Sequence, residues 1–309
     1  MMTRLLPPSL LPQLERLSIV SNRRVRGMTQ GKRRSGRLGA SLEFADYREY
    51  APGDDIRRFD WGVYSRTGRP FIRQYWDEQE LAISLYVDIS TSMKFGEGEQ
   101  NKLLYAKQLA ASVGYMALAS HDRVQAFQCT DKVEKYLPSI RGKASASRLF
   151  SFLEGGMDID DADKPEAGNA PGNLAAALRQ PEAIPRRPGM TWIFSDFWHE
   201  DGFNSLADSI SLIQATGQDI VLVQVMSAEE IAPVLSGDLR LIDSELGTGK
   251  EVALTGKILD SYKRTFEQYI REISSFCSER GIRYVQASTH IPLERGVIGI
   301  LRSAGAIGS

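Results

Sequence analysis

The chain has 309 residues, of which 42% are hydrophobic and 25% charged, and its formal net charge is −1 at pH 7. This composition excludes a disordered or fibrous protein, and the length allows one large α/β domain with a smaller accessory region. A net charge near zero gives no overall attraction to nucleic acid or to an anionic membrane.

Cysteine usage and hydropathy indicate a cytoplasmic protein. Cys129 and Cys277 are the two cysteines, and neither has metal-ligand spacing around it, so we expect two reduced thiols. No apolar segment reaches the ~18 residues of a membrane span. Prolines interrupt the apolar N-terminal segment LLPPSLLPQL, which also lacks the charged start of a signal peptide.

Residues 10–40 combine a short helix pattern with a basic segment. Leu11, Leu14 and Leu17 predict an amphipathic helix within residues 10–20. The segment from 21 to 37 carries seven lysines and arginines and no acid. This basic arm favours either a partner that is acidic or bears phosphate, or a solvated segment. It contains no aromatic residue, which disfavours binding of single-stranded nucleic acid.

Residues 41–80 are dense in aromatic residues and in charges of both signs. Turn signals at Pro52-Gly53 and Arg69-Pro70 predict short strands and turns. The acids and arginines predict an internal ion-pair network, because a partly buried charge must be paired. A minority of these side chains is expected to face a partner. The candidates are Arg48, Asp54, Asp55, Arg57, Asp60, Trp61 and Arg66.

From residue 81 onward, predicted strands alternate with predicted helices. The predicted strands cover residues 81–88, 123–129, 133–137, 190–194, 220–226 and 282–287. A hairpin is expected over residues 239–254. The predicted helices cover residues 101–120, 144–153, 206–215, 259–280 and 293–303. This alternation predicts an α/β fold: a doubly wound, mainly parallel sheet over residues 81–309, preceded by a small β-rich extension over residues 1–80.

An acidic segment rich in glycine and proline, residues 154–173, interrupts this alternation. A loop of this length in a compact domain is usually functional or disordered. Asn173 ends it and is expected to cap the helix that begins with LAAAL.

Two predicted strands deliver oxygen ligands to one end of the sheet. Asp88 ends the first of them and is followed by Ser90 and Ser92, and Asp196 follows the strand over 190–194. In open α/β sheets, ligands bind beyond the carboxyl ends of the strands. If the two strands are neighbours, these four side chains converge, and their hydroxyl and carboxylate oxygens suit Mg²⁺.

The run Asp88-Ile-Ser90-Thr91-Ser92 resembles the Asp-x-Ser-x-Ser motif of von Willebrand factor A domains, which is their metal-ion-dependent adhesion site. Asp196 matches the aspartate that this family supplies after a later strand. The resemblance implies a von Willebrand A-like fold and a Mg²⁺ ion whose coordination shell is completed by an Asp or Glu of a partner.

The middle loop of this site departs from the family pattern. Where the family supplies a threonine just before a helix, this chain has Gly172 and Asn173. Asn173 is therefore the remaining ligand candidate, and it offers an amide oxygen from a shifted position.

The segment from 39 to 66 resembles a second signature, that of the bacterial domain-of-unknown-function 58 family, whose members pair it with a von Willebrand A-like domain. The shared residues are Gly39, Glu43, Phe44, Arg48, Tyr50, Gly53, Asp54, Asp55, Arg57, Asp60, Trp61 and Arg66. The resemblance implies association with MoxR-type AAA+ ATPases and a role as an adaptor in the assembly or maturation of other proteins.

Three other interpretations compete for these residues. Asp88, Ser90 and Ser92 could be strand-end and helix-cap residues without a metal. Asp88 could be a phosphatase-type nucleophile, although that chemistry requires a second Asp where this chain has Ser90. The basic arm could bind nucleic acid, with a steep salt dependence. We expect a non-catalytic protein-interaction module that uses Mg²⁺, with the phosphatase as first and nucleic-acid binding as second alternative.

Overall fold

The computed structural model describes residues 5–20, 34–38, 44–78, 80–155, 173–198, 202–233, 237–242, 249–254 and 256–308. The predicted basic arm up to residue 33 and the acidic loop over 156–172 lie outside these ranges. The chain divides into two compact units, Met1–Ser21 with Leu81–Ser309, and Asn22–Glu80.

The N-terminal residues belong to the larger unit, whereas the sequence placed residues 1–80 in one region. Leu10 and Leu14, around the short helix α1 (Leu11–Glu15), are fully buried in the same hydrophobic core as the central strands. Strand β1 (Ser18–Ile19) pairs antiparallel with β13 (Ile307–Gly308) at the other end of the chain. Periodicity within a segment does not reveal which distant core it joins, so no local pattern predicts this pairing.

A six-stranded sheet in the order β12-β9-β8-β5-β6-β7 forms the centre of the larger unit. Its strands are β5 (Ala82–Asp88), β6 (Arg123–Cys129), β7 (Val133–Arg141), β8 (Gly189–Ser195), β9 (Gln218–Met226) and β12 (Arg283–Ser288). All neighbours are parallel except β6 and β7, which form the predicted antiparallel pair. The predicted mostly parallel α/β sheet is therefore confirmed.

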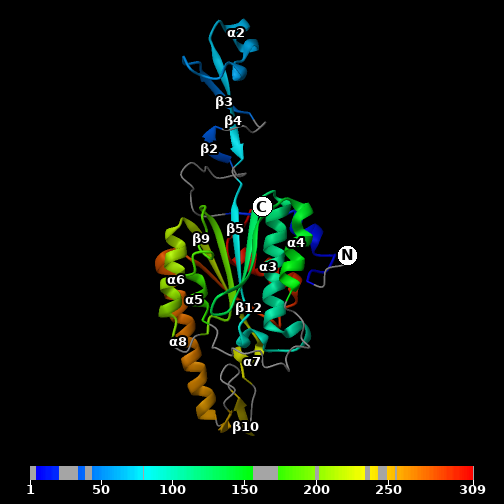
Figure 1. Ribbon diagram of the computed structural model, residues 1–309, viewed down its shortest axis with the longest axis vertical. Coiled ribbons are helices and arrows are strands. Elements are labelled where there is room, and N and C mark those ends of the chain that lie inside the picture. The colour runs from blue at the N-terminus through cyan, green and yellow to red at the C-terminus, as the bar shows by residue number, and fades with distance from the viewer. Residues whose placement is uncertain are drawn as a thin grey trace. The chain divides into compact units, whose positions relative to one another are not determined.

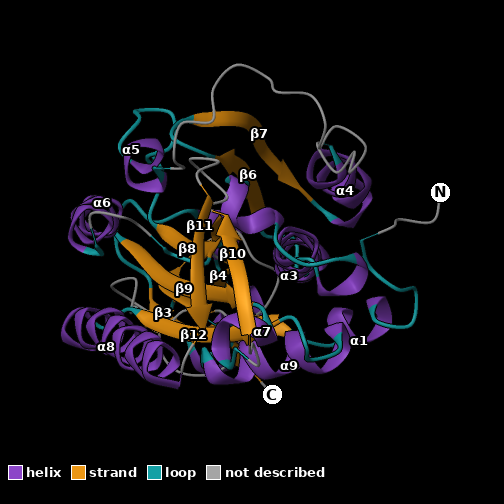
Figure 2. Ribbon diagram, turned by 90° about the horizontal axis from the view of Figure 1, so that it is seen from below, coloured by secondary structure: helices purple, strands orange, loops and turns teal. Residues whose placement is uncertain are grey.

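Helices cover both faces of this sheet (Figures 1 and 2). One face carries α1, α3 (Lys102–Ala119), α4 (Ala146–Glu154) and α9 (Leu293–Ser303), and the other carries α5 (Leu174–Leu178), α6 (Asn204–Ala215) and α8 (Gly256–Arg280). The strands suit this position because side chains alternate between faces. Leu85 and Val87 of β5 lie in the hydrophobic core on the α3 face of the sheet, and Tyr86 lies in the core on the α6 face.

Shorter elements complete the larger unit. Helix α7 (Ala228–Ile231) follows β9, and β10 (Gly237–Ile242) pairs antiparallel with β11 (Gly249–Leu254) as the predicted hairpin. In Figure 1, α7 lies at the carboxyl end of the parallel strands. This end of the sheet carries the candidate site.

The smaller unit contains three antiparallel strands in the order β2-β4-β3, namely β2 (Arg34–Leu38), β3 (Phe44–Glu49) and β4 (Phe71–Glu78). Between β3 and β4 lie a 3-10 turn, η1 (Ile56–Arg58), and helix α2 (Trp61–Thr67). The sequence predicted strands and turns here and missed α2. The helix forms because the Asp60 side chain caps its first turn and Gly68, at φ 68°, ends it.

Candidate functional site

Asp88 and Asp196 meet at the carboxyl end of two adjacent parallel strands. Val87 of β5 is paired with Phe194 of β8, so the next residues, Asp88 and Ser195, stand opposite each other. The Ser195 hydroxyl donates to Asp88 Oδ2 at 2.6 Å, and both residues are buried. The two strands are neighbours, which is the condition under which the sequence predicted that these side chains converge, and their register sets the geometry of the site.

Ser90 and Ser92 extend this cluster from the loop after β5. The backbone N–H of Ser90 donates to Asp88 Oδ1 at 2.9 Å, and the hydroxyl oxygens of Ser90 and Ser92 lie 3.1 Å apart. The 3-10 turn η2 (Thr91–Lys94) begins between them. The structure thus brings Asp88, Ser90 and Ser92 together, as the sequence predicted.

Burial, and then the charge of Asp196, raises the pKa of Asp88 to about 6, against the lowering effect of its hydrogen bonds with Ser195 and Ser90. The physical cause is that a carboxylate in this buried position loses hydration and lies near a second negative charge. Asp88 therefore takes up a proton at a pH much closer to neutral than an exposed aspartate does.

Lys102 is a member of this cluster that was not among the predicted site residues. Its ammonium donates to Asp196 Oδ2 at 2.8 Å and to Glu230 Oε1 at 2.7 Å, and its side chain is fully buried. Lys102 is the first residue of α3, after the N-cap Asn101. A cation is unfavourable at a helix N-terminus. That position, followed by apolar residues, was the available signal that Lys102 needs acidic partners.

The ammonium of Lys102 stays charged. Burial lowers its pKa, but the charges and hydrogen bonds of Asp196 and Glu230 raise it by more, so the net shift is upward. A buried charge of this kind requires close and hydrogen-bonded partners of opposite sign. Lys102 therefore neutralises part of the negative charge at the end of the sheet.

Glu230 has two separate roles. Its Oε1 accepts from Lys102, and its Oε2 accepts from the backbone N–H of Ser227 at 2.8 Å. The Ser227 hydroxyl in turn accepts from the backbone N–H of Glu230, which completes a capping box at the start of α7. The sequence Ser-x-x-Glu after an apolar strand was the signal for this cap, and the tie to Lys102 had none.

Asn173 does not join the other predicted ligands. Its side-chain oxygen accepts from the backbone N–H of Ala176 at 3.1 Å and caps α5, as the sequence analysis expected. Among the hydrogen bonds of the described residues, none links Asn173 to Asp88, Ser90 or Asp196.

The described arrangement does not fit the predicted Mg²⁺ ion. All four carboxylate oxygens of Asp88 and Asp196 accept hydrogen bonds from the protein, and one of the donors is the Lys102 ammonium. This ammonium already supplies a cation to Asp196 and would repel a second one at that carboxylate. Within the described part of the chain, no group of three or more His, Cys, Asp or Glu side chains is placed to hold a metal ion.

Large apolar side chains stand exposed around this polar cluster. Phe95 and Trp198, in the loops after β5 and β8, are each 49% exposed, and Ile231 and Ile291, after β9 and β12, are also exposed. These four strands are adjacent and parallel, so their following loops lie at one edge of the sheet. We call these four side chains the carboxyl-end patch.

The two cysteines do not contribute a reactive group. Cys129 and Cys277 are buried free thiols. Burial raises the pKa of both, for Cys277 to about 12. A thiol with a raised pKa is a poor nucleophile because the thiolate is the reactive form.

The predicted partner-binding residues of the smaller unit divide into two groups. Arg48 pairs with Asp54 at 2.7 Å, and Asp55 caps η1 through the backbone N–H of Arg57. The Asp60 carboxylate is buried and accepts from Arg73, Val63 and Tyr47. The hydrogen bond from Arg73 and the one from Val63 hold the pKa of Asp60 far below its usual range. These residues maintain the fold of the unit.

Trp61, Arg57 and Arg66 form the second group, because their side chains are exposed. Neither arginine forms an ion pair with a described side chain, and Arg66 Nε donates to the Gly62 carbonyl in the same helix. Trp61 contacts the rings of Phe59 and Tyr64 and still leaves most of its surface exposed. The sequence pattern selected both groups together, and only the structure separates them.

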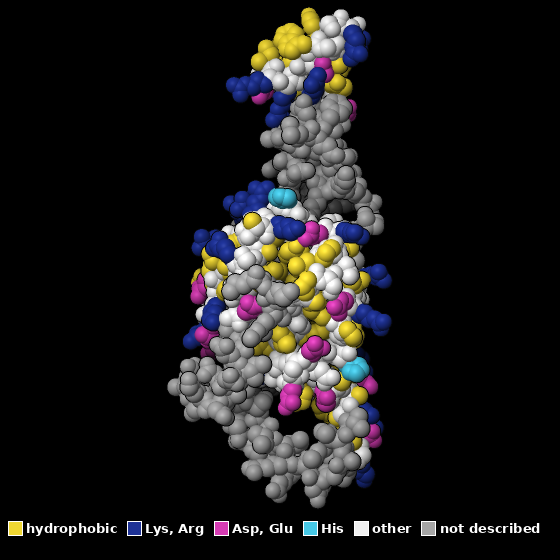
Figure 3. Space-filling view, turned by 90° about the vertical axis from the view of Figure 1, so that its right-hand side faces the viewer, with side chains coloured by type: hydrophobic (Ala, Val, Ile, Leu, Met, Phe, Trp, Pro, Cys, Tyr) yellow, Lys and Arg dark blue, Asp and Glu magenta, His cyan; other side chains and the backbone are white. Residues whose placement is uncertain are grey.

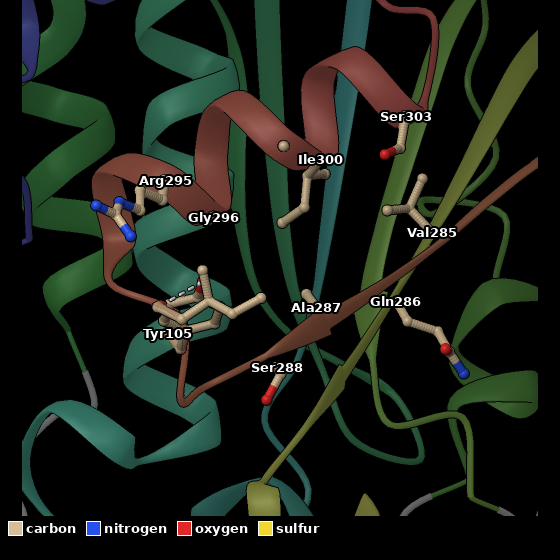
Figure 4. Close-up of a pocket in the computed structure, with 11 residues that line it drawn as sticks. Tyr105, Val285, Gln286, Ala287, Ser288, Arg295, Gly296, Ile300 and Ser303 are labelled. Carbon is tan, nitrogen blue, oxygen red and sulfur yellow. Dashed lines mark hydrogen bonds between the residues drawn. The ribbon is translucent and has the colours of Figure 1, made fainter.

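A shallow cavity of about 180 Å³ lies between β12 and α9 (Figure 4). Tyr105 and Gly296 line one end of it, and Val285 and Ser303 the other. Ligand pockets for small molecules usually measure about 300 Å³ or more. The cavity is therefore too small to compete with the carboxyl end of the sheet as a candidate site.

Comparison with known proteins identifies the family. The family model described as "Protein of unknown function DUF58" matches residues 46–272, about three quarters of the chain. The chain belongs to the DUF58 family. This confirms the resemblance that residues 39–66 suggested.

Two relatives of this DUF58 chain come from mycobacteria. Uncharacterized protein Mb1516 of Mycobacterium bovis is 28% identical over 261 residues, which cover 83% of this chain and 78% of the relative. Uncharacterized protein Rv1480 of Mycobacterium tuberculosis has the same identity and coverage.

Two solved structures resemble this DUF58 chain distantly. The conserved hypothetical protein BatB from Bacteroides thetaiotaomicron gives a TM-score of 0.43 at 14% identity, over 73% of this chain and 98% of that one. An aerotolerance-related membrane protein from Bacteroides fragilis gives 0.41 at 16% identity, with the same coverage. Scores at this level carry no functional argument. Among its own described helices, the DUF58 chain has none long and apolar enough to cross a membrane.

Proposed function

We propose that this DUF58 protein is a non-catalytic protein-interaction module that binds its partner at the carboxyl end of the six-stranded sheet. The observation that carries the proposal is the carboxyl-end patch, in which the segments after four adjacent strands, helix α7 among them, each expose one large apolar side chain. Exposed apolar side chains that gather over a polar centre are typical of protein-binding surfaces.

The larger unit has, in this proposal, a von Willebrand A-like architecture. Its support is the parallel pairing of β5 and β8, which sets the Asp88-x-Ser90-x-Ser92 run beside Ser195 and Asp196. The loops after these strands then present the binding surface, as the adhesion sites of that family do.

The proposed surface works without a bound metal ion. Its support is Lys102, which supplies positive charge to Asp196 and Glu230 from within the fold. The Lys102 ammonium holds the segments that bear Asp196 and Glu230 in place. A partner then contacts the carboxyl-end patch around these residues. The surface is then expected to need no Mg²⁺ beyond the Mg²⁺ that the ATP of the partner binds.

Two features support an interaction module over the phosphatase alternative. Both carboxylate oxygens of Asp88 are engaged in hydrogen bonds, with Ser90 and Ser195. The position two residues on, where that chemistry needs a general acid, is Ser90. We propose a MoxR-type AAA+ ATPase as the partner, because the resemblance of residues 39–66 to the family signature implies it.

The test is a binding measurement between the purified full chain and the MoxR-type ATPase of the same organism, with ATP present. Wild type should bind when the only Mg²⁺ present is the Mg²⁺ bound to ATP. The double variant Phe95→Ser/Trp198→Ser should lose at least about tenfold in affinity. Leu212→Ser is the matched control, because Leu212 is an exposed residue of α6 away from these loops. Equal affinity for all three proteins would exclude the carboxyl-end patch, and no binding by wild type would exclude this partner.

A further inference from the structure

The smaller unit carries an aromatic cluster that is not buried. Phe59, Trp61 and Tyr64 contact one another, with ring centroids 4.5 Å (Phe59–Trp61), 5.6 Å (Phe59–Tyr64) and 6.4 Å (Trp61–Tyr64) apart, and Phe59 also contacts Tyr50 at 6.1 Å. Trp61 is nevertheless 63% exposed, and Ile56, just before the cluster, is 62% exposed. Figure 3 shows hydrophobic side chains gathered on this unit, with basic side chains beside them. We call Ile56, Phe59, Trp61 and Tyr64 the Trp61 face.

Packing within the unit does not explain this exposure. The buried anchor of α2 is Asp60, which caps the helix and pairs with Arg73. Trp61 and Tyr64 are three residues apart and therefore share the outer side of the helix. A tryptophan held in place by a neighbouring ring, with most of its surface in water, is pre-organised for an external contact at low entropic cost.

Unpaired positive charge surrounds the Trp61 face. Arg57, Arg58, Arg66 and Arg69 lie in η1, in α2 and just after α2, and none of them forms an ion pair with a described side chain. Asp60 is the one acid among residues 56–69, and it pairs with Arg73. Asp55, just before them, accepts the backbone N–H of Arg57 and forms no ion pair with a described side chain. The face therefore presents an excess of positive charge, which favours an acidic partner.

The type of cation favours a protein as that partner. Every basic residue from 34 to 78 is an arginine, and the segment contains no lysine. Arginine, tryptophan and tyrosine are enriched at protein interfaces and dominate their binding energy, whereas lysine is depleted there. Anionic membranes and nucleic-acid phosphates attract lysine and arginine alike. Binding to either one therefore does not explain why residues 34–78 contain arginine and no lysine.

We infer that the Trp61 face is a second docking site of this protein, which binds an acidic protein segment carrying an apolar side chain between Asp or Glu residues. The apolar side chain packs on Trp61 and Tyr64, and the acids pair with Arg57, Arg58 and Arg66. This site is separate from the carboxyl-end patch and does not rest on the ATPase partnership.

The test uses a random peptide display library selected on the full chain and counter-selected on the Trp61→Ala variant. The enriched peptides should share one or two apolar residues flanked by acids. A synthetic peptide of the consensus sequence, measured by fluorescence anisotropy, should bind wild type and lose at least about tenfold in affinity with Trp61→Ala. Arg57→Glu/Arg58→Glu should weaken it similarly, and added NaCl should weaken binding to wild type.

Two controls separate this result from misfolding and from membrane binding. Phe95→Ser/Trp198→Ser should leave the affinity for the peptide unchanged, and circular dichroism should show that Trp61→Ala keeps the native spectrum. Vesicles containing phosphatidylglycerol are the competing probe. The inference is overturned if no enriched peptide depends on Trp61, if the enriched peptides are basic, or if Trp61-dependent binding is to the vesicles.

Discussion

At the N-terminus of α3, one buried ammonium links three parts of the larger unit. Lys102 joins its own helix to Asp196 in the loop after β8 and to Glu230 in α7. Removing one partner of a buried ion pair leaves the remaining charges without compensation, which costs more than the net contribution of the pair. The three residues therefore act as one unit that fixes the loop after β8 and helix α7 at the proposed binding surface.

We expect Lys102→Ala to lower the free energy of unfolding by about 3 kcal/mol in urea denaturation, because Asp196 and Glu230 lose their cation. Lys94→Ala is the control, since Lys94 is exposed at the end of the 3-10 turn η2. Added Mg²⁺ should raise the melting temperature of Lys102→Ala and leave that of wild type unchanged. A rise of similar size for wild type would show that Mg²⁺ binds beside Lys102. It would contradict the conclusion that this site does not fit Mg²⁺.

Lys107 is a second buried lysine of α3, and it lacks an acidic partner among the described residues. Its ammonium donates to the Gly155 carbonyl at 3.4 Å. Burial, with a contribution from the charge of Lys135, lowers the pKa of Lys107 from 10.5 to about 8. At neutral pH the folded protein thus holds a charged group in a position that favours the neutral form.

Lys107→Met should therefore stabilise the protein at pH 7, by on the order of 2 kcal/mol. In wild type the unfolded chain binds more protons than the folded one between the lowered pKa near 8 and the ordinary value of 10.5. Its stability should rise with pH across this window, and the variant should lack that contribution. Urea denaturation at several pH values measures the difference, with the exposed Lys132→Met as control. Equal stability at pH 7 would contradict the expected cost of burial.

At the scale of elements, α9 approaches α3 so closely that a glycine is required between them. A Cβ at Gly296 would overlap the hydroxyl of Tyr105, which donates to the Ile291 carbonyl at 3.0 Å. Gly299 lies three residues on in the same helix and has open space around its Cα. The two glycines therefore differ in packing while sharing the same backbone conformation.

Gly296→Ala should lower the free energy of unfolding by about 2 kcal/mol, because the added methyl group displaces Tyr105. Gly299→Ala should leave stability unchanged or raise it by up to about 1 kcal/mol through helix propensity. Thermal unfolding of both variants measures the contrast. Opposite signs of the two effects are the expected outcome, and equal effects would place the cause in propensity and not in packing.

Elements with strong local signals were predicted well. The terminal helix over 293–303 coincides with α9, and the strands over 123–129 and 220–226 coincide with β6 and most of β9. Helix α2 was missed because its residues lack an apolar period of their own and its start depends on Asp60, whose carboxylate also binds Arg73 on β4. A cap that doubles as an ion pair across strands has no distinct sequence pattern.

At the scale of the whole molecule, the N-terminal residues pack into the same unit as the C-terminal part of the chain. Leu14 and its neighbours are buried in the same core as β5, although residues 22–80 of the other unit separate them in sequence. We expect Leu14→Ala to destabilise the larger unit by about 2–5 kcal/mol. Gln13→Ala is the control, because Gln13 is exposed in the same helix. Near-equal stability of the two variants would show that α1 does not belong to the core of the larger unit.

The two proposed surfaces lie in different units and are tested by different variants. Phe95→Ser/Trp198→Ser addresses the carboxyl-end patch of the larger unit, and Trp61→Ala addresses the smaller one. If the protein bridges two partners, each variant should remove one partner and leave the other bound.

The sequence by itself determined the alternation of helices and strands, the placement of Asp88 and Asp196 at strand ends, and membership of the family. These depend on local periodicity and on motifs that lie within a few residues. Tertiary structure alone decided that Lys102 is the cation of the site, since its partner Glu230 lies 128 residues away in the chain. It also decided which charged residues of the smaller unit pair internally. The exposure of Trp61 follows from the same packing. Partner choice between distant side chains follows from packing, and no local pattern records it.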